Sequence, residues 1–124
     1  MGHRILICDD SEFIRKILKT VLLEGGYEIC GEASNGSEAI QKYRILKPDG
    51  VIMDIALPGV GGIAAVSEIR SSDPEAKIIM CSAKKELIYD AIQAGASSFI
   101  TKPFKNNHVL EAVTKTLGDF EDLR

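Results

Sequence analysis

Residues 50–54 read Gly-Val-Ile-Met-Asp, a short apolar run that ends in a carboxylate. Consecutive apolar side chains without alternating polar ones are typical of a strand that is buried on both faces. Similar runs recur on either side of this stretch, at residues 4–9, 27–33, 77–82 and 98–101. Five such runs predict a parallel sheet whose two faces are covered by helices.

Helical patterns fill the intervals between these runs. After the first run, apolar residues recur at helical spacing from Phe13 to Leu22, with Ser11 as the expected N-cap and Gly25-Gly26 as the stop. The fourth pattern contains the apolar residues Leu87, Ile88, Ala91 and Ile92 and closes at Gly95. The remaining helices are expected to begin at residue 35, to follow residue 62, and to cover residues 109–117.

The order of these segments predicts a single α/β domain over residues 1–124, with a core at about residues 4–117. Five strand–helix units suit an open, doubly wound parallel sheet with five helices. A closed barrel of the same kind needs eight strands.

Composition excludes several classes of protein. The chain has 15 basic and 18 acidic residues and a net charge of -3, so it lacks the excess of Lys and Arg that drives nucleic-acid binding. No apolar run approaches the ~18 residues of a membrane span, and residues 5–8 are too short for a signal-peptide core. We therefore expect a cytoplasmic protein without a nucleic-acid or membrane partner. The cysteines, three in number, all lie in apolar runs, where Cys acts as a small hydrophobe.

Reactive side chains follow four of the five predicted strands. In an open parallel sheet, ligands bind outside the carboxyl ends of the strands, where the strand order reverses. The residues at these ends are Asp9-Asp10, Asp54, Ser82-Ala83 and Thr101-Lys102-Pro103.

If the first and third strands are neighbours, three carboxylates share one small volume, and a divalent cation and Lys102 would relieve their repulsion. A carboxylate, Mg²⁺, a lysine and a hydroxyl are the groups that phosphoryl transfer requires. Each residue alone could instead be a helix cap, a turn residue or a solvated side chain. This chemistry does not choose among the three carboxylates as the nucleophile.

Taken in order and spacing, a set of short motifs resembles the response-regulator receiver domains, in particular the stand-alone chemotaxis regulators. These motifs are Ile7-Cys8-Asp9-Asp10-Ser11, Ala33-Ser34-Asn35-Gly36, Met53-Asp54-Ile55-Ala56-Leu57-Pro58, Gly62, Ser82-Ala83, Ala94-Gly95-Ala96 and Thr101-Lys102-Pro103-Phe104. The resemblance covers residues 4 to about 117. It implies a flavodoxin-like sheet of strand order 2-1-3-4-5, which makes the first and third strands neighbours.

The resemblance also implies a role for each site residue. Asp54 would be the phosphoacceptor, and Lys102 would pair with a phosphoryl oxygen. Mg²⁺, with Mn²⁺ as a substitute, would be bound by Asp10, Asp54 and the carbonyl of Ala56, and by Asp9 partly through water. Ser82 would be the switch hydroxyl and Phe99 the switch aromatic. The bond between Lys102 and Pro103 is expected to be cis.

Two residues depart from common patterns of the family. Ala56 has no polar side chain, and Lys84 is cationic, at positions that the family places beside the phosphoryl group. Ala56 cannot orient an attacking water, and Lys84 can hold phosphoryl oxygens. We therefore predict that these two residues tune the lifetime of the phosphoryl group.

The implied function is that of a two-component response regulator and not of a turnover enzyme. A histidine kinase would phosphorylate the protein, and the surface of the fourth helix, fifth strand and fifth helix would then change. Exposed residues are expected there at Lys84, Lys85, Tyr89, Asn106 and His108. The flagellar motor switch is the expected target, a phosphatase is a further partner, and the protein is expected to be a monomer.

Other functions remain open at this point. The chain could be a phosphorelay intermediate or a receiver cut from a larger regulator. A small aspartate-nucleophile phosphohydrolase would need Asp-x-Asp after the first strand, whereas Asp9 and Asp10 are adjacent here and position 11 is Ser.

Overall fold

Five parallel strands form one sheet in the order β2-β1-β3-β4-β5 in the computed structural model, which describes residues 2–119. The strands are β1 (Arg4–Cys8), β2 (Glu28–Ala33), β3 (Gly50–Asp54), β4 (Ile78–Ser82) and β5 (Ser98–Thr101). The order confirms the predicted fold class and makes β1 and β3 neighbours, with Cys8 opposite Met53.

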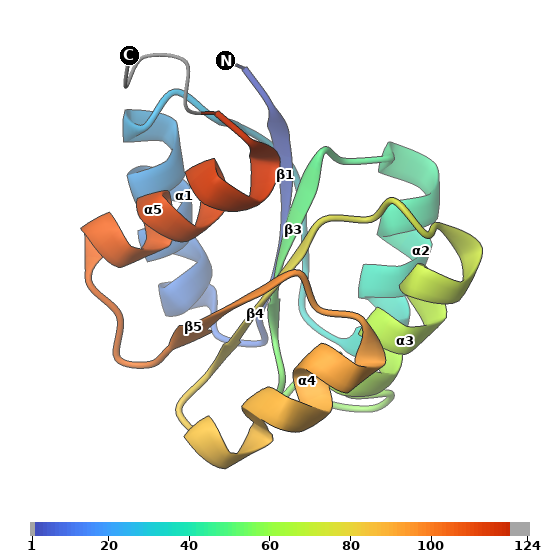
Figure 1. Ribbon diagram of the computed structural model, residues 1–124. Helices are drawn as coiled ribbons and strands as arrows, with labels where there is room; N and C mark the ends of the chain where they lie inside the picture. Colours follow the sequence, from blue (N-terminus) through green and yellow to red (C-terminus); the bar gives the residue numbers. More distant parts are fainter. Residues whose placement is uncertain (1, 120–124) are drawn as a thin grey trace.

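A helix follows each strand. The helices are α1 (Glu12–Glu24), α2 (Gly36–Leu46), α3 (Gly62–Ser72), α4 (Ile88–Ala94) and α5 (Asn106–Leu117), and a 3₁₀ turn at Lys85–Leu87 precedes α4. Figure 1 shows α1 and α5 on one face of the sheet and α2, α3 and α4 on the other. Within residues 2–119, none of these helices combines the length and the apolar character that a membrane crossing requires.

The start of α1 matches its sequence signal. The Ser11 hydroxyl oxygen accepts a hydrogen bond from the Ile14 amide at 3.2 Å, which satisfies one of the free N–H groups of the first turn. At the other end, the Gly25 amide donates to the carbonyls of Val21 and Leu22. These two ends fix where α1 leaves β1, and therefore where its first turn lies relative to Asp9 and Asp10.

Two apolar layers hold the sheet. Successive residues of a strand face opposite sides, so Leu6 and Cys8 of β1 pack in the layer under α2, α3 and α4. Ile5 and Ile7 pack in the layer under α1 and α5. Burial on both sides fixes the position of the central strands. It thereby also fixes the position of the residues at their carboxyl ends.

Three details differ from the expectations. β2 is only partly buried because it is an edge strand with β1 as its single neighbour, and its Cys30 is partly exposed. Phe13 and Ile92 fit the helical patterns, but 71% and 52% of their surfaces are exposed. The α4 helix is only seven residues long, and Ala91 is its buried residue. Such a short helix buries a narrower stripe than the sequence pattern indicated.

Candidate functional site

Three carboxylates meet at the carboxyl ends of β1 and β3. Asp9 and Asp10 follow β1 directly, and Asp54 is the last residue of β3. Because the two strands are parallel neighbours, one carboxylate oxygen from each residue lies within 4.8 Å of the others. Asp9 and Asp54 are buried, whereas Asp10 is exposed. The cluster therefore has a buried floor and opens to solvent beside Asp10.

Lys102 brings the one ammonium group that contacts these carboxylates within the described residues. It follows β5, and its amide donates to the Ser82 carbonyl at 2.8 Å. Its Nζ lies 2.9 Å from Asp9 Oδ2 and 3.5 Å from Asp54 Oδ1. The peptide bond from Lys102 to Pro103 is cis, as expected. One ammonium among three carboxylates leaves excess negative charge when all three are ionised.

The pKa values of Asp54 and Lys102 reflect this crowding. Burial raises the pKa of Asp54, and the negative charge of Asp9 raises it further. The Lys102 ammonium and the Ala56 amide oppose that rise but do not cancel it. Burial lowers the pKa of Lys102, yet its hydrogen bond to Asp9 and the charges of Asp54 and Asp9 raise it above its ordinary value. Lys102 is therefore charged at neutral pH, while Asp54 lacks full compensation for its charge.

The donor set fits a hard divalent cation. Carboxylate and carbonyl oxygens are the protein ligands of Mg²⁺ and Mn²⁺. Neighbouring ligand oxygens around Mg²⁺ lie roughly 3 Å apart, as octahedral bonds of about 2.1 Å require. The three oxygens already lie within 4.8 Å of one another, so the cluster offers the right kind of ligand atom in one small volume. A bound cation would also neutralise the charge that Lys102 leaves uncompensated.

The other predicted site residues surround this cluster at different distances. Ser82 is buried at the end of β4, the strand beside β3, and its hydroxyl oxygen accepts from the Lys84 amide at 3.0 Å. The Ala56 amide donates to Asp54 Oδ1 at 3.3 Å. Phe99 lies in β5 opposite Met80 and packs, partly buried, against the core under α4. Lys84 is exposed, and its ammonium makes no hydrogen bond or ion pair within residues 2–119.

Arg15 of α1 contacts the backbone of Asp9, a contact that the sequence patterns did not predict. Arg15 donates through Nη1 to the carbonyl oxygen of Asp9 at 2.6 Å and through Nε to Glu32 Oε1 at 2.8 Å. A signal for this contact was present in the sequence. Arg15 is three residues before Leu18 and seven before Leu22, both fully buried, so it places a cation in the apolar stripe of α1.

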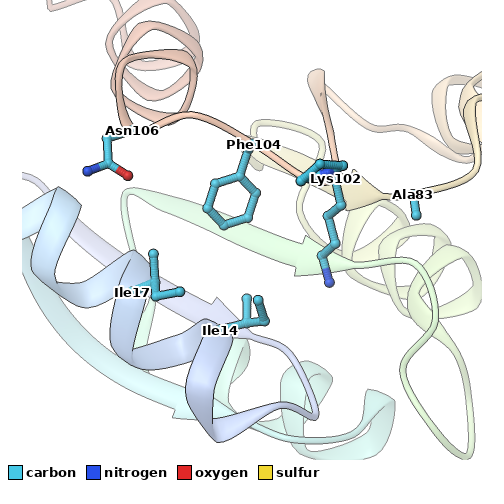
Figure 2. Close-up of a pocket in the computed structure, with 7 residues that line it drawn as sticks. Ile14, Ile17, Ala83, Lys102, Phe104 and Asn106 are labelled. Atoms are coloured by element: carbon cyan, nitrogen blue, oxygen red, sulfur yellow. The ribbon is translucent and has the colours of Figure 1, made fainter.

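A pocket of about 470 Å³ adjoins the cluster on the α1 side. Figure 2 shows Phe104 and Asn106 facing Ile14 and Ile17 of α1 across this pocket, with the Lys102 side chain beside them. Lys102 therefore contacts the carboxylates and also borders an open, largely apolar pocket.

The chain is similar to proteins of one known family. A model of the response regulator receiver domain matches residues 5–114. The chain belongs to this family. It is 50% identical to the chemotaxis protein CheY of Bacillus subtilis (strain 168) over 120 residues, which cover 95% of this chain and all of that protein. It is 51% identical to the CheY protein of Thermotoga maritima over 117 residues, covering 93% of this chain and 98% of that one.

A solved structure of a related receiver domain shows the same fold. The match is to the complex of CheX, CheY, BeF3 and Mg²⁺ from Borrelia burgdorferi, with a TM-score of 0.86 and 37% sequence identity. The alignment covers 91% of this chain and 87% of that one. The chain is therefore a CheY-like receiver domain of the two-component type, a signalling domain with an acidic pocket compatible with Mg²⁺.

Proposed function

We propose that this receiver domain accepts a phosphoryl group on Asp54 in a Mg²⁺-dependent reaction, with a histidine kinase or a small phosphodonor as the source. One observation carries this proposal. Asp54 is the buried carboxylate at the end of β3 whose Oδ1 lies 3.5 Å from the Lys102 ammonium and close to both Asp9 and Asp10. Nucleophile, cationic partner and metal-binding oxygens therefore lie within one site.

The proposed cation site consists of Asp10, Asp54 and the carbonyl oxygen of Ala56, with Asp9 acting partly through water. Mn²⁺ would substitute for Mg²⁺ because both favour oxygen ligands. When bound, the cation would supply positive charge to the oxygens of the phosphoryl group. The Borrelia burgdorferi complex, which contains Mg²⁺ with a related CheY, supports this choice of metal.

The reaction forms one bond and breaks one. An oxygen of the ionised Asp54 attacks phosphorus, and the bond from phosphorus to the leaving group breaks, so that the phosphohistidine nitrogen or the acetate oxygen keeps the electron pair. Lys102 donates a hydrogen bond to a phosphoryl oxygen. Its hydrogen bond to Asp9 at 2.9 Å holds the ammonium in place beforehand, so little reorganisation is needed during the transfer.

Phosphorylation would then change the surface of α4, β5 and α5. The Ser82 hydroxyl, which accepts from the Lys84 amide in this structure, would turn toward the phosphoryl group, and Phe99 would fill the space behind it. Such a change is a shift between two packings, driven by contacts that exist only in one of them. Lys84, Lys85, Tyr89, Asn106 and His108 are all exposed on this side of the chain and would contact the target.

The flagellar motor switch is the proposed target. The similarity to chemotaxis proteins at 50% identity supports it. A phosphatase is a second proposed partner. The complex of CheX with a related CheY supports only the more general point that a receiver of this kind binds another protein.

Ala56 and Lys84 are proposed to set the phosphoryl lifetime. Ala56 is exposed and has no group to orient water, and Lys84 is an exposed cation two residues after Ser82. The variants Ala56→Asn and Lys84→Glu should change the dephosphorylation rate of the phosphorylated protein. An unchanged rate in both variants would show that these side chains have no such role.

Intact-mass measurement tests the assignment of Asp54. The wild-type chain is incubated with acetyl phosphate and Mg²⁺, and one phosphoryl adduct is expected. The adduct should disappear in Asp54→Asn and in wild type treated with EDTA, while the exposed-site control Asp90→Asn should keep it. Absence of the adduct in wild type, or its persistence in Asp54→Asn, would refute the proposal.

A further inference from the structure

Every backbone and carboxylate group of Asp9 has a hydrogen-bond partner. Its amide donates to the Ala33 carbonyl at 3.0 Å. Its Oδ1 accepts from the Ser11 amide at 2.9 Å, its Oδ2 from Lys102 at 2.9 Å, and its carbonyl oxygen from Arg15 at 2.6 Å. Asp9 is therefore held from β2, from the start of α1 and from the loop after β5.

The surroundings of Asp10, the next residue, are quite different. It is exposed, and within residues 2–119 its carboxylate accepts no hydrogen bond. No hydrogen bond holds this carboxylate itself, so the backbone on either side of Asp10 is what fixes the point from which its side chain extends. Groups that orient a metal ligand from outside affect the affinity for the metal, and for Asp10 such a group would have to act through the backbone.

Arg15 fixes the backbone at this point. The carbonyl oxygen of Asp9 belongs to the planar peptide unit that joins Asp9 to Asp10. A hydrogen bond to that oxygen fixes the rotation of the plane and thereby the position of the Asp10 Cα atom. At 2.6 Å, the bond from the Arg15 guanidinium is short, and its donor is charged, which makes it stronger than a bond between neutral groups.

Glu32 holds the guanidinium itself. Its Oε1 accepts from Arg15 Nε at 2.8 Å, and its Oε2 accepts from Lys19 Nζ at 2.9 Å. The Arg15 side chain is only 17% exposed, so it exchanges few of these contacts for water. Lys19 shares Glu32 with Arg15 but, within residues 2–119, makes no hydrogen bond or ion pair with Asp9. The two cations can therefore be compared directly.

We propose that Arg15 is a positioning residue for the cation site. It bridges Glu32 of β2 and the Asp9–Asp10 peptide so that the Asp10 carboxylate faces Asp54. This inference rests on the proposed Mg²⁺-dependent function, and it assigns no contact between Arg15 and the cation itself.

The experiment measures the dissociation constant of Mg²⁺ by isothermal titration calorimetry on the cation-free chain. Arg15→Met should raise this constant about tenfold, the lower end of the effect seen when support of a metal ligand is lost. Lys19→Met removes the other cation that binds Glu32, and its constant should stay close to the wild-type value. Arg44→Met, which breaks the exposed Arg44–Glu68 ion pair, is the control for loss of a surface arginine and should also stay close.

Arg15→Lys is the second variant, and it keeps the measurement informative if Arg15→Met fails to fold. A lysine retains the charge but has no planar fork to bridge Glu32 and the Asp9 carbonyl together. We expect a dissociation constant between those of wild type and Arg15→Met. A wild-type constant in Arg15→Lys would overturn the bridging role, because a cation alone would then suffice.

The remaining outcomes separate this inference from the proposed function. If wild type binds Mg²⁺ and Arg15→Met binds it equally well, only the positioning role is wrong. The same conclusion follows if Lys19→Met loses as much affinity as Arg15→Met, since the effect would then belong to the α1–β2 tether. Absence of Mg²⁺ binding by wild type would overturn both proposals.

Discussion

Asp54 is buried at the end of β3, yet it must be ionised to attack a phosphoryl group. Burial and the neighbouring Asp9 raise its pKa, so the folded chain binds this proton more tightly than the unfolded chain does. Ionised Asp54 therefore destabilises the native state when no cation is present. Asp54, which the proposed chemistry requires, is therefore present although its ionised form lowers the free energy of unfolding. Such a cost is common at functional sites.

The variant Asp54→Asn should be more stable than wild type at pH 7 in EDTA. The cost of ionised Asp54 begins as the pH rises past its ordinary value of 3.8 and is complete above the raised folded-state pKa. The gain from Asn should therefore be largest at neutral pH and should vanish as the pH falls below 3.8. Urea unfolding of both proteins across this range measures it. A gain that is independent of pH would contradict the explanation.

Lys102, in contrast to ionised Asp54, stabilises the native state. Its loss would leave the buried Asp9 carboxylate without its cation, and removing one partner of a buried pair costs about 3 kcal/mol. We expect Lys102→Met to lose that much free energy of unfolding in EDTA. The double variant Asp9→Asn with Lys102→Met should recover only part of it, because Asp9 then carries no charge while Asp54 still lacks the ammonium.

A matched control for this measurement is Lys77→Met. Lys77 is exposed and its ammonium has no ion pair within residues 2–119, so its loss should cost less than about 0.5 kcal/mol. An equal loss in Lys77→Met and Lys102→Met would show that the carboxylate cluster is not what Lys102 stabilises.

At the scale of elements, the start of α3 sets the position of Asp54. The Gly62 amide donates to the Ile55 carbonyl at 3.0 Å, and a Cβ atom on Gly62 would overlap the Asp54 carbonyl oxygen and lie 2.7 Å from the Ile55 Cα. Helix propensity alone predicts that Ala at position 62 would stabilise α3. The close approach of α3 to β3 predicts the reverse, because backbone atoms would have to move.

We expect Gly62→Ala to lower the free energy of unfolding by more than about 2 kcal/mol, the cost of overpacking against a rigid backbone. Gly59→Ala is the comparison, since a Cβ there meets nothing within 4 Å and only its positive φ of 75° causes strain. That strain costs about 1 kcal/mol. Thermal and urea unfolding of both variants would measure the difference, and a stabilising Gly62→Ala would show that propensity decides at this site.

Elements also show how far a pattern along the chain can be trusted. The structure confirms the Ser11 cap of α1 and the buried strands β1, β3 and β4. These features could be predicted because they depend on residues that are close together in the sequence. Ile92 matches the helical period equally well but is 52% exposed. Its burial depended on how much of α4 the sheet covers, which no local pattern contains.

At the scale of the whole molecule, strand order joins distant residues into one site. The cluster combines residues 9 and 10 with residues 54 and 102, because β1 and β3 are neighbours and the Lys102 side chain reaches Asp9 and Asp54 from the end of β5. Such a site exists only in the folded chain. A cation that binds it therefore stabilises the entire fold.

Mg²⁺ should raise the free energy of unfolding by about 2.7 kcal/mol at a concentration one hundred times its dissociation constant. Asp10→Asn should lose most of this gain, because an exposed ligand is removed without disturbing the core. The exposed Asp90 of α4 provides the control, and Asp90→Asn should keep the full gain. Equal stabilisation of all three proteins by Mg²⁺ would place the cation elsewhere on the chain.

The affinity for Mg²⁺ should also depend on pH. Protons compete with the cation for Asp54, and the raised pKa of this residue extends that competition to higher pH. The apparent dissociation constant should therefore fall as the pH rises through the pKa of Asp54, and calorimetry at several pH values would record it. A constant that does not change with pH would mean that Asp54 does not contribute to binding.

The sequence by itself determined the alternation of five strands and five helices, the caps, and the kinds of reactive side chain at the strand ends, because these follow from periodicity and residue type. Only the tertiary structure decided how those side chains meet. It placed three carboxylate oxygens within 4.8 Å, buried Asp9 and Asp54 but not Asp10, and joined Arg15 to the Asp9 carbonyl. Such distances depend on strand order and on side-chain direction across the sheet, and these arise when the whole chain packs.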